Sequence, residues 1–285
     1  MRRWAGSSLL FGLAVGLVAP AKAQTHSGEG PVTRIDHFFA ETAAFQELLQ
    51  FFKGTLRLPQ AWPDQDYGSF ATGAVSLGNV TLEVVRFADS SPDRATFAGI
   101  ALEPAGDTDA LIGWLTAVGM DYEPPQAFPP AGPAFFVNTS LPQLSSGATE
   151  VFVCDYKDRR MILDGQAAAA AALAADDGGP LGILGVLELT LETTDIDRSL
   201  GVWSELVATA ERDGDDVVVG FESGPAIRVV PGATDRLTGI TISVRSMDAA
   251  EAFLDEADLA ERDATGELRI ARGAVGGLEL TLVER

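Results

Sequence analysis

The chain has 285 residues, enough for two domains of ordinary size that each bury a core. It carries 41 acidic side chains against 20 basic ones, an excess that repels phosphate backbones and anionic lipid headgroups and argues against nucleic-acid or membrane partners. Cys154 is the single cysteine, so no intramolecular disulfide can form; within an apolar run it is predicted to be a buried filler.

The first 23 residues are typical of a secretory signal peptide. Two arginines precede an apolar stretch, Leu9 to Val18, and Ala21-Lys22-Ala23 is a small-x-small cleavage site. The apolar stretch is too short to span a bilayer comfortably. We therefore expect residues 1–23 to be removed, residues 24–31 to form a tether, and the mature protein to be periplasmic or secreted.

The remaining chain repeats one order of elements four times: a short strand, an amphipathic helix, then strands of alternating polarity. In the first copy, Phe45, Leu48, Leu49 and Phe52 form one apolar helical stripe. Strands are predicted next around residues 69–76 and 81–87, with Gly78-Asn79 as the turn between them. The other copies are predicted to start at Thr96, Leu184 and Leu237.

A βαβββ unit leaves the concave face of a half-closed sheet exposed, so two such units are expected to pair into an eight-stranded cup. Four units predict an α+β protein with two cups. We assign residues 32–163 to the first domain and 183–285 to the second. An alanine-rich segment within 164–182 is predicted to be a linker helix.

Two groups of motifs carry a family resemblance. Ile35-Asp36-His37 ahead of a helix, followed by the segment from Leu77 to Glu83, resembles the glyoxalase-like domains of the vicinal-oxygen-chelate superfamily. Gly179-Pro180-Leu181-Gly182, leading into Asp195-Ile196-Asp197-Arg198, is similar to its two-domain members. The superfamily includes glyoxalase I, extradiol dioxygenases and epimerases, and also metal-free proteins that sequester drugs.

The resemblance implies that His37 and Glu83 are metal ligands and catalytic residues in the first cup. An imidazole and a carboxylate suit Zn, Ni, Mn or Fe(II). The second copy places Gly99 and Phe152 where the partner ligands would stand, and two protein ligands make a weak catalytic metal site. A hydrogen-bonded pair is the alternative, able to act as a general base or to bind a ligand hydroxyl.

The second cup has a different set of residues at the corresponding positions. Glu188 takes the position of His37 and Arg228 that of Glu83, with Gly239 and Thr281 at the other two. A carboxylate facing a guanidinium predicts an ion pair in place of a metal. We expect the second domain to be structural, or a pocket for a polar ligand.

Aromatic side chains fall in or beside the segments expected at the rim of the first cup. They could bind an apolar or aromatic ligand, although ordinary packing explains them equally well. These candidate pocket residues are Trp62, Tyr67, Phe70, Phe135 and Phe136.

Three functions remain open from the sequence. The first is a metal-dependent lyase, isomerase or dioxygenase that uses His37 and Glu83. The second is a metal-free protein that binds or sequesters a small organic molecule, and the third is a structural or interaction module. The sequence predicts neither the ligand nor the oligomeric state.

Overall fold

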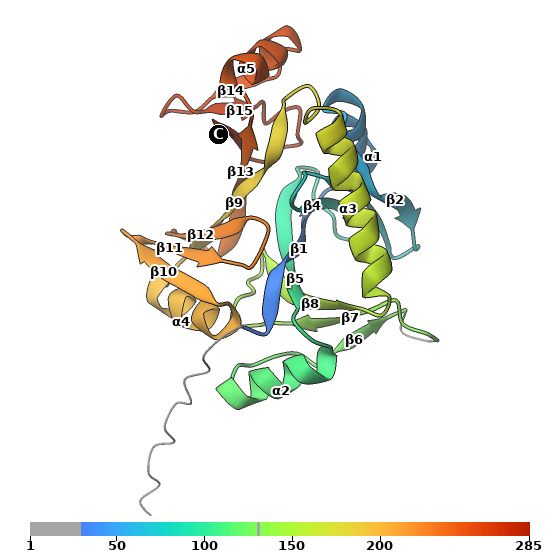
Figure 1. Ribbon diagram of the computed structural model, residues 1–285, viewed down its shortest axis with the longest axis vertical. Helices are drawn as coiled ribbons and strands as arrows, with labels where there is room; N and C mark the ends of the chain where they lie inside the picture. The colour runs from blue at the N-terminus through green and yellow to red at the C-terminus, as the bar shows by residue number, and fades with distance from the viewer. Residues whose placement is uncertain (1–29, 130–131) are drawn as a thin grey trace, which may run out of the picture.

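A computed structural model describes residues 30–129 and 132–285. The predicted signal peptide and most of the predicted tether lie outside these residues. The described chain forms two eight-stranded sheets that lie side by side, each strongly curled, with helices on their outer faces (Figure 1). None of the described helices is long and apolar enough to cross a membrane.

The N-terminal sheet is built from two βαβββ units. The strands at the two ends of the sheet, β2 and β6, come from different units, and β1 and β5 lie together at the middle. The first unit consists of β1 (Val32–Glu41), α1 (Phe45–Gln50), a π-helical turn (Phe51–Thr55), β2 (Gln60–Asp66), β3 (Phe70–Ser76) and β4 (Thr81–Phe87). The second consists of β5 (Thr96–Pro104), α2 (Thr108–Val118), β6 (Gln126–Phe128), β7 (Phe136–Ser140) and β8 (Glu150–Tyr156).

The C-terminal sheet repeats this arrangement strand for strand, with β9 and β13 at the middle. The predicted architecture of four βαβββ units in two paired sheets is therefore confirmed. The third unit consists of β9 (Ile183–Thr193), α4 (Ile196–Leu206), β10 (Thr209–Asp213), β11 (Asp216–Gly220) and β12 (Ala226–Pro231). The fourth consists of β13 (Arg236–Val244), α5 (Met247–Glu256), β14 (Ala260–Arg262), β15 (Leu268–Ile270) and β16 (Leu280–Glu284).

Local sequence explains where three of the helices begin. Asp107, Asp195 and Ser246 each accept a hydrogen bond from a backbone N–H in the first turn of α2, α4 and α5, respectively. Gly119 ends α2 in the left-handed conformation that favours glycine. The sequence did not predict strand β2, which contains Pro63; β2 lies at the sheet edge, where a residue without an N–H is tolerated.

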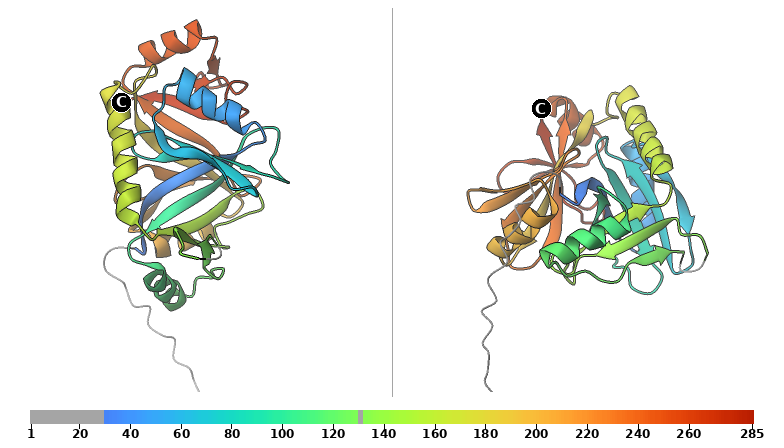
Figure 2. Two further views of the ribbon diagram at one scale, coloured as in Figure 1. Left: turned by 90° about the vertical axis from the view of Figure 1, so that its right-hand side faces the viewer. Right: turned by 60° about the horizontal axis from the view of Figure 1, so that its bottom comes forward.

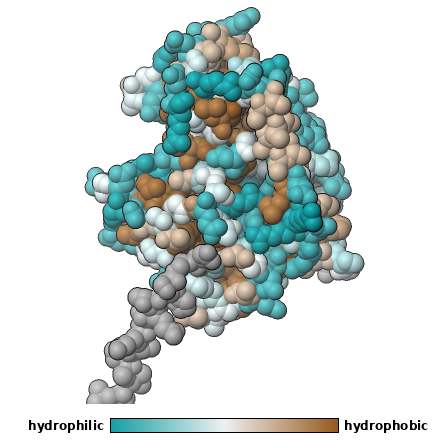
Figure 3. Space-filling model, in the orientation of Figure 1, coloured by the Kyte–Doolittle hydropathy of each residue, from teal (hydrophilic) through white to brown (hydrophobic). Residues whose placement is uncertain are grey.

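The linker helix α3 (Arg159–Ala175) is longer than predicted, because Asp158 caps it through the N–H of Met161. It crosses one end of the N-terminal half-barrel and contacts β2 and β3 on one side and β8 on the other. Figure 2 shows it running along the side of this sheet. In the space-filling view its alanines form a pale brown strip beside a recess with more strongly hydrophobic residues (Figure 3).

The two sheets share one continuous hydrophobic core that includes residues from both halves of the chain. Hydrogen bonds between side chains and backbone also join the two halves. The Asn79 side chain donates to the carbonyl of Val186 and accepts from its N–H, both at 2.8 Å, and Thr149 Oγ1 accepts from the N–H of Leu237 at 2.8 Å. This docking fixes the first cup relative to the second.

Candidate ligand site in the N-terminal cup

His37 and Glu83 meet on the concave face of the N-terminal sheet. His37 comes from β1 and Glu83 from the adjacent parallel strand β4, and His37 Nε2 lies 3.3 Å from Glu83 Oε2. The Thr72 hydroxyl donates a hydrogen bond to the other oxygen of Glu83. The structure thus brings together the two residues that the sequence singled out.

A β-bulge gives His37 a second carboxylate partner. Ile35 pairs with Leu102 and His37 with Ala101, so Asp36 is an extra residue on β1. Its Oδ2 accepts a hydrogen bond from His37 Nδ1 at 2.6 Å, and Asp36 is 1% exposed. Alternation along a regular strand would place these neighbours on opposite faces, so no pattern in the sequence predicts this contact.

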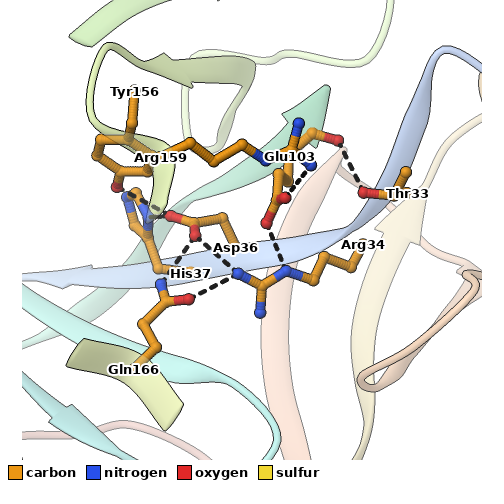
Figure 4. A network of polar contacts seen from close by, with 8 residues as sticks. All are labelled: Thr33, Arg34, Asp36, His37, Glu103, Tyr156, Arg159 and Gln166. Carbon is orange, nitrogen blue, oxygen red and sulfur yellow. Dashed lines mark hydrogen bonds and ion pairs between the residues drawn. The ribbon is translucent and has the colours of Figure 1, made fainter. Parts of the chain in front are cut away.

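A buried polar network surrounds Asp36 (Figure 4). Tyr156 donates to Asp36 Oδ2 at 2.9 Å, and Gln166 of α3 donates to Asp36 Oδ1 at 2.8 Å. Arg34 donates to Gln166 at 2.6 Å and to Glu103 at 2.5 Å. Arg159 also pairs with Glu103. The sequence analysis missed these supporting residues, which come from four separate elements.

The network holds His37 in its charged form. Burial alone would lower the pKa of His37, but hydrogen bonds to Asp36 and Glu83 outweigh it and raise the pKa to about 10. Burial likewise opposes ionisation of Asp36, yet the hydrogen bond from His37 keeps the pKa of Asp36 below its usual range. Because His37 is already protonated at neutral pH, it is poorly suited to act there as a general base.

Symmetry within the sheet identifies the two remaining positions of a metal site. Phe38 pairs with Ile100, and a twofold axis through this pair relates His37 to Gly99 and Phe39 to Ala101. Glu83 pairs with Phe39. Phe152 pairs with Ala101 and therefore corresponds to Glu83.

These two positions do not fit a metal ion. Gly99 has no side chain, and a Cβ there would lie 2.1 Å from the Phe39 ring and 2.8 Å from the Glu150 carbonyl oxygen. Phe152 offers a ring whose centroid is 6.1 Å from that of His37. In residues 30–129 and 132–285 no group of three or more His, Cys, Asp or Glu side chains is arranged to hold a metal. His37 and Glu83 therefore form a two-donor set.

Aromatic rings from opposite edges of the curled sheet meet over the cup. Tyr67 stacks on Phe70 of β3 with a centroid distance of 4.9 Å, and both rings contact Phe128 of β6, at 5.2 and 5.6 Å. Phe128 stacks in turn on Phe136 of β7 at 5.2 Å. Phe128, absent from the sequence-based set, is the ring that joins the two edges.

The other two candidate aromatic residues behave differently from each other. The Trp62 ring lies edge-on to His37, with centroids 5.5 Å apart. Phe135 is 63% exposed, whereas its neighbour Phe136 packs on the small apolar cluster inside the cup. The structure therefore gathers Trp62, Tyr67, Phe70 and Phe136 near the buried pair and leaves Phe135 at the surface. The cluster consists of Phe39, Val85, Ala101, Phe152 and Cys154.

The second cup carries the predicted ion pair. Arg228 Nε lies 3.0 Å from Glu188 Oε2, and its Nη1 lies 3.0 Å from Asp213 and 3.3 Å from Asp216. The same symmetry, through the pair Leu189 and Ile240, places Gly239 and Thr281 at the other two positions. Three carboxylates around one guanidinium make this cup a structural ion-pair cluster.

Comparison with known proteins gives structural relatives only. No family model and no curated protein sequence matches the chain. An extradiol ring-cleaving dioxygenase from B. fuscum superposes with a TM-score of 0.61 at 10% identity, covering 89% of this chain and 72% of that chain. Homoprotocatechuate 2,3-dioxygenase from Arthrobacter globiformis has a TM-score of 0.57 at 14% identity, covering 91% and 82%. A variant of the B. fuscum enzyme in complex with HPCA has a TM-score of 0.56 at 11% identity, covering 89% and 71%. The chain has the vicinal-oxygen-chelate fold.

Proposed function

We propose that this chain uses its vicinal-oxygen-chelate fold to bind a small organic molecule in the N-terminal cup without a metal ion. One observation carries the proposal: aromatic rings from both edges of the sheet converge over a buried imidazole–carboxylate pair whose symmetry-related positions are Gly99 and Phe152. Apolar surface with a few fixed polar groups is the usual composition of a small-molecule site.

Binding of one-ring aromatic probes tests this proposal. Benzylammonium, benzyl alcohol and benzoate share a ring and differ in charge, and saturation-transfer NMR detects even weak binding. We expect at least one to bind and Phe136→Ala to weaken its binding, because Phe136 packs on the cup cluster. Phe135→Ala is the matched control, since that ring is 63% exposed. If all three probes fail to bind, or if the two variants weaken binding equally, the proposal is wrong.

A metal-dependent dioxygenase is the second candidate, favoured by the likeness to ring-cleaving dioxygenases and by the proximity of His37 to Glu83. Elemental analysis of protein purified without added metal distinguishes the two candidates. Stoichiometric Fe, Mn, Ni or Zn that disappears in His37→Ala would support the dioxygenase. We expect no stoichiometric metal in either protein, because the pair offers two donors.

We also propose that the mature protein acts outside the cytoplasm, as the sequence of residues 1–23 indicates. Intact-mass analysis of periplasmic or secreted protein tests this. We expect the mass of a chain that begins at Gln24. Full-length protein found in the cytoplasm would contradict export.

A further inference from the structure

The charged group that a ligand can reach in the cup is a carboxylate. The Glu83 side chain is 15% exposed, the His37 side chain 7% and the Asp36 side chain 1%. His37 is therefore shielded between its partners, while Glu83 is the most exposed of the three. A carboxylate accepts up to about four hydrogen bonds, and Glu83 receives one from Thr72 and an ion-pair contact from His37. It retains capacity for a donor on the ligand.

A second acceptor lies on the same face of the sheet. Asn138 is two residues after Phe136 on β7 and pairs with Cys154, a member of the apolar cluster in the cup. Its Oδ1 is buried and has no hydrogen-bond partner in the described part of the chain. A buried carbonyl oxygen without a partner loses free energy that a ligand N–H would restore.

The carboxylates of Asp36 and Glu83 disfavour further negative charge in the cup. Burial, followed by the Glu83 carboxylate, raises the pKa of Tyr67. Burial, followed by the Asp36 carboxylate, raises the pKa of Cys154 and of Tyr156. Tyr67, just before β3, and Cys154 and Tyr156, both on β8, thus resist becoming anions. The carboxylates that disfavour an anion at these places favour a cation there.

The aromatic rings suit such a cation. The face of an aromatic ring attracts an ammonium or guanidinium group, and the attraction is stronger when water is excluded. Tyr67 and Phe70 form one wall, and Thr72, two residues after Phe70 on the same face of β3, donates a hydrogen bond to Glu83. Ring faces and a carboxylate together can surround a positive group that has an apolar body.

We propose that the N-terminal cup selects organic cations, with the ammonium or amidinium N–H groups directed at Glu83 and the apolar body packed against the aromatic rings. This inference rests on the proposed small-molecule function and specifies its ligand class. The unpartnered Asn138 oxygen, the remaining acceptor capacity of Glu83 and the aromatic rings all favour a positive charge on the ligand.

The three one-ring probes test the charge preference on the unmodified protein. Isothermal titration calorimetry at pH 7 and low salt should show benzylammonium binding at least about tenfold tighter than benzyl alcohol, with benzoate weakest. Stronger or equal binding of benzyl alcohol or benzoate would overturn the cation inference while leaving the proposed function standing. Absence of binding by all three would overturn both.

Variants assign the preference to one carboxylate. Glu83→Gln should reduce benzylammonium affinity about tenfold or more and change benzyl alcohol affinity little. Glu47→Gln, which removes an exposed carboxylate from α1 on the outer face, is the matched control and should leave both affinities unchanged. Equal losses in the two variants, or no loss in Glu83→Gln, would contradict the role of Glu83. Should Glu83→Gln not fold, the ranking of probes on the unmodified chain still decides.

Discussion

His37 links the protonation of one residue to the stability of the N-terminal half. The pKa of His37 is about 10 in the folded chain, whereas an unperturbed histidine has a pKa of 6.5. A raised folded pKa gives stability that is fully present below pH 6.5 and is lost as pH rises through about 10. We predict that the unfolding free energy in urea decreases between pH 6.5 and about 10 more steeply for the native protein than for His37→Gln. The difference in slope is at most about 1.4 kcal/mol per pH unit. Parallel curves for the two proteins would show that His37 is not held as an imidazolium.

Arg228 has the corresponding structural role in the second cup. It is the one basic group among Glu188, Asp213 and Asp216, so its removal leaves three carboxylates in mutual repulsion. We expect Arg228→Ala to lower the unfolding free energy by about 2 kcal/mol. This is less than the cost of breaking a fully buried pair, because the Arg228 side chain is 29% exposed. Arg236→Ala, which removes a 54% exposed partner of Glu192, should cost under about 0.5 kcal/mol. Equal melting temperatures for the two variants would contradict the prediction.

Single residues were predictable only where strand alternation places them. Glu83 and Arg228 lie on a concave face through the regular period of two along β4 and β12. His37 and Glu188 each directly follow a bulge and keep that period only with the residues after them. Asp36 was missed because a bulge displaces it. The sequence carries no marker for that bulge, since it depends on how β1 pairs with a strand about sixty residues away.

Because β8 corresponds to β4 in the other unit, one substitution on β8, at Phe152, can add a metal ligand to the cup. Phe152→Glu would place a third donor opposite His37 and Glu83, and three donors are the usual minimum for catalytic zinc. We predict that Zn²⁺ raises the melting temperature of Phe152→Glu, and that chelation reverses the increase. The native chain and Phe152→Gln should respond little. Equal zinc stabilisation of the native chain would mean that its donor set is already sufficient.

Elements with strong apolar periodicity were predicted well, and short strands at or next to a sheet edge were not. The helical stripe of Phe45, Leu48, Leu49 and Phe52 corresponds to α1 and the π-helical turn that follows it. Strands β6, β14 and β15 have three residues each, too few for a period of two to be distinguished from a loop. They form through pairing with their neighbours, a tertiary contribution that local sequence does not contain.

At the scale of the whole molecule, the fourfold repeat predicted two cups but not how closely they are joined. The repeat is visible because each unit carries its own periodicity. The joining depends on contacts such as that of Asn79, in a turn of the first unit, with the backbone of β9. Because glycine readily adopts the positive φ seen at Gly78, the sequence predicts a turn at Gly78-Asn79. It does not predict that Asn79 binds Val186, about a hundred residues away.

The shared core and these cross-links predict that both halves unfold together. Chemical denaturation followed by tryptophan fluorescence and by far-UV circular dichroism should give coincident single transitions. Asn79→Ala should lower the unfolding free energy by about 2 kcal/mol, because it removes two hydrogen bonds and leaves the N–H and carbonyl of Val186 unpaired. Gln126→Ala, which removes an exposed amide on the edge strand β6, should change it by less than about 0.5 kcal/mol. If Asn79→Ala instead separates the transition into two steps, the Asn79 contact is what makes the halves cooperative; if it has no effect, the shared core alone holds them together.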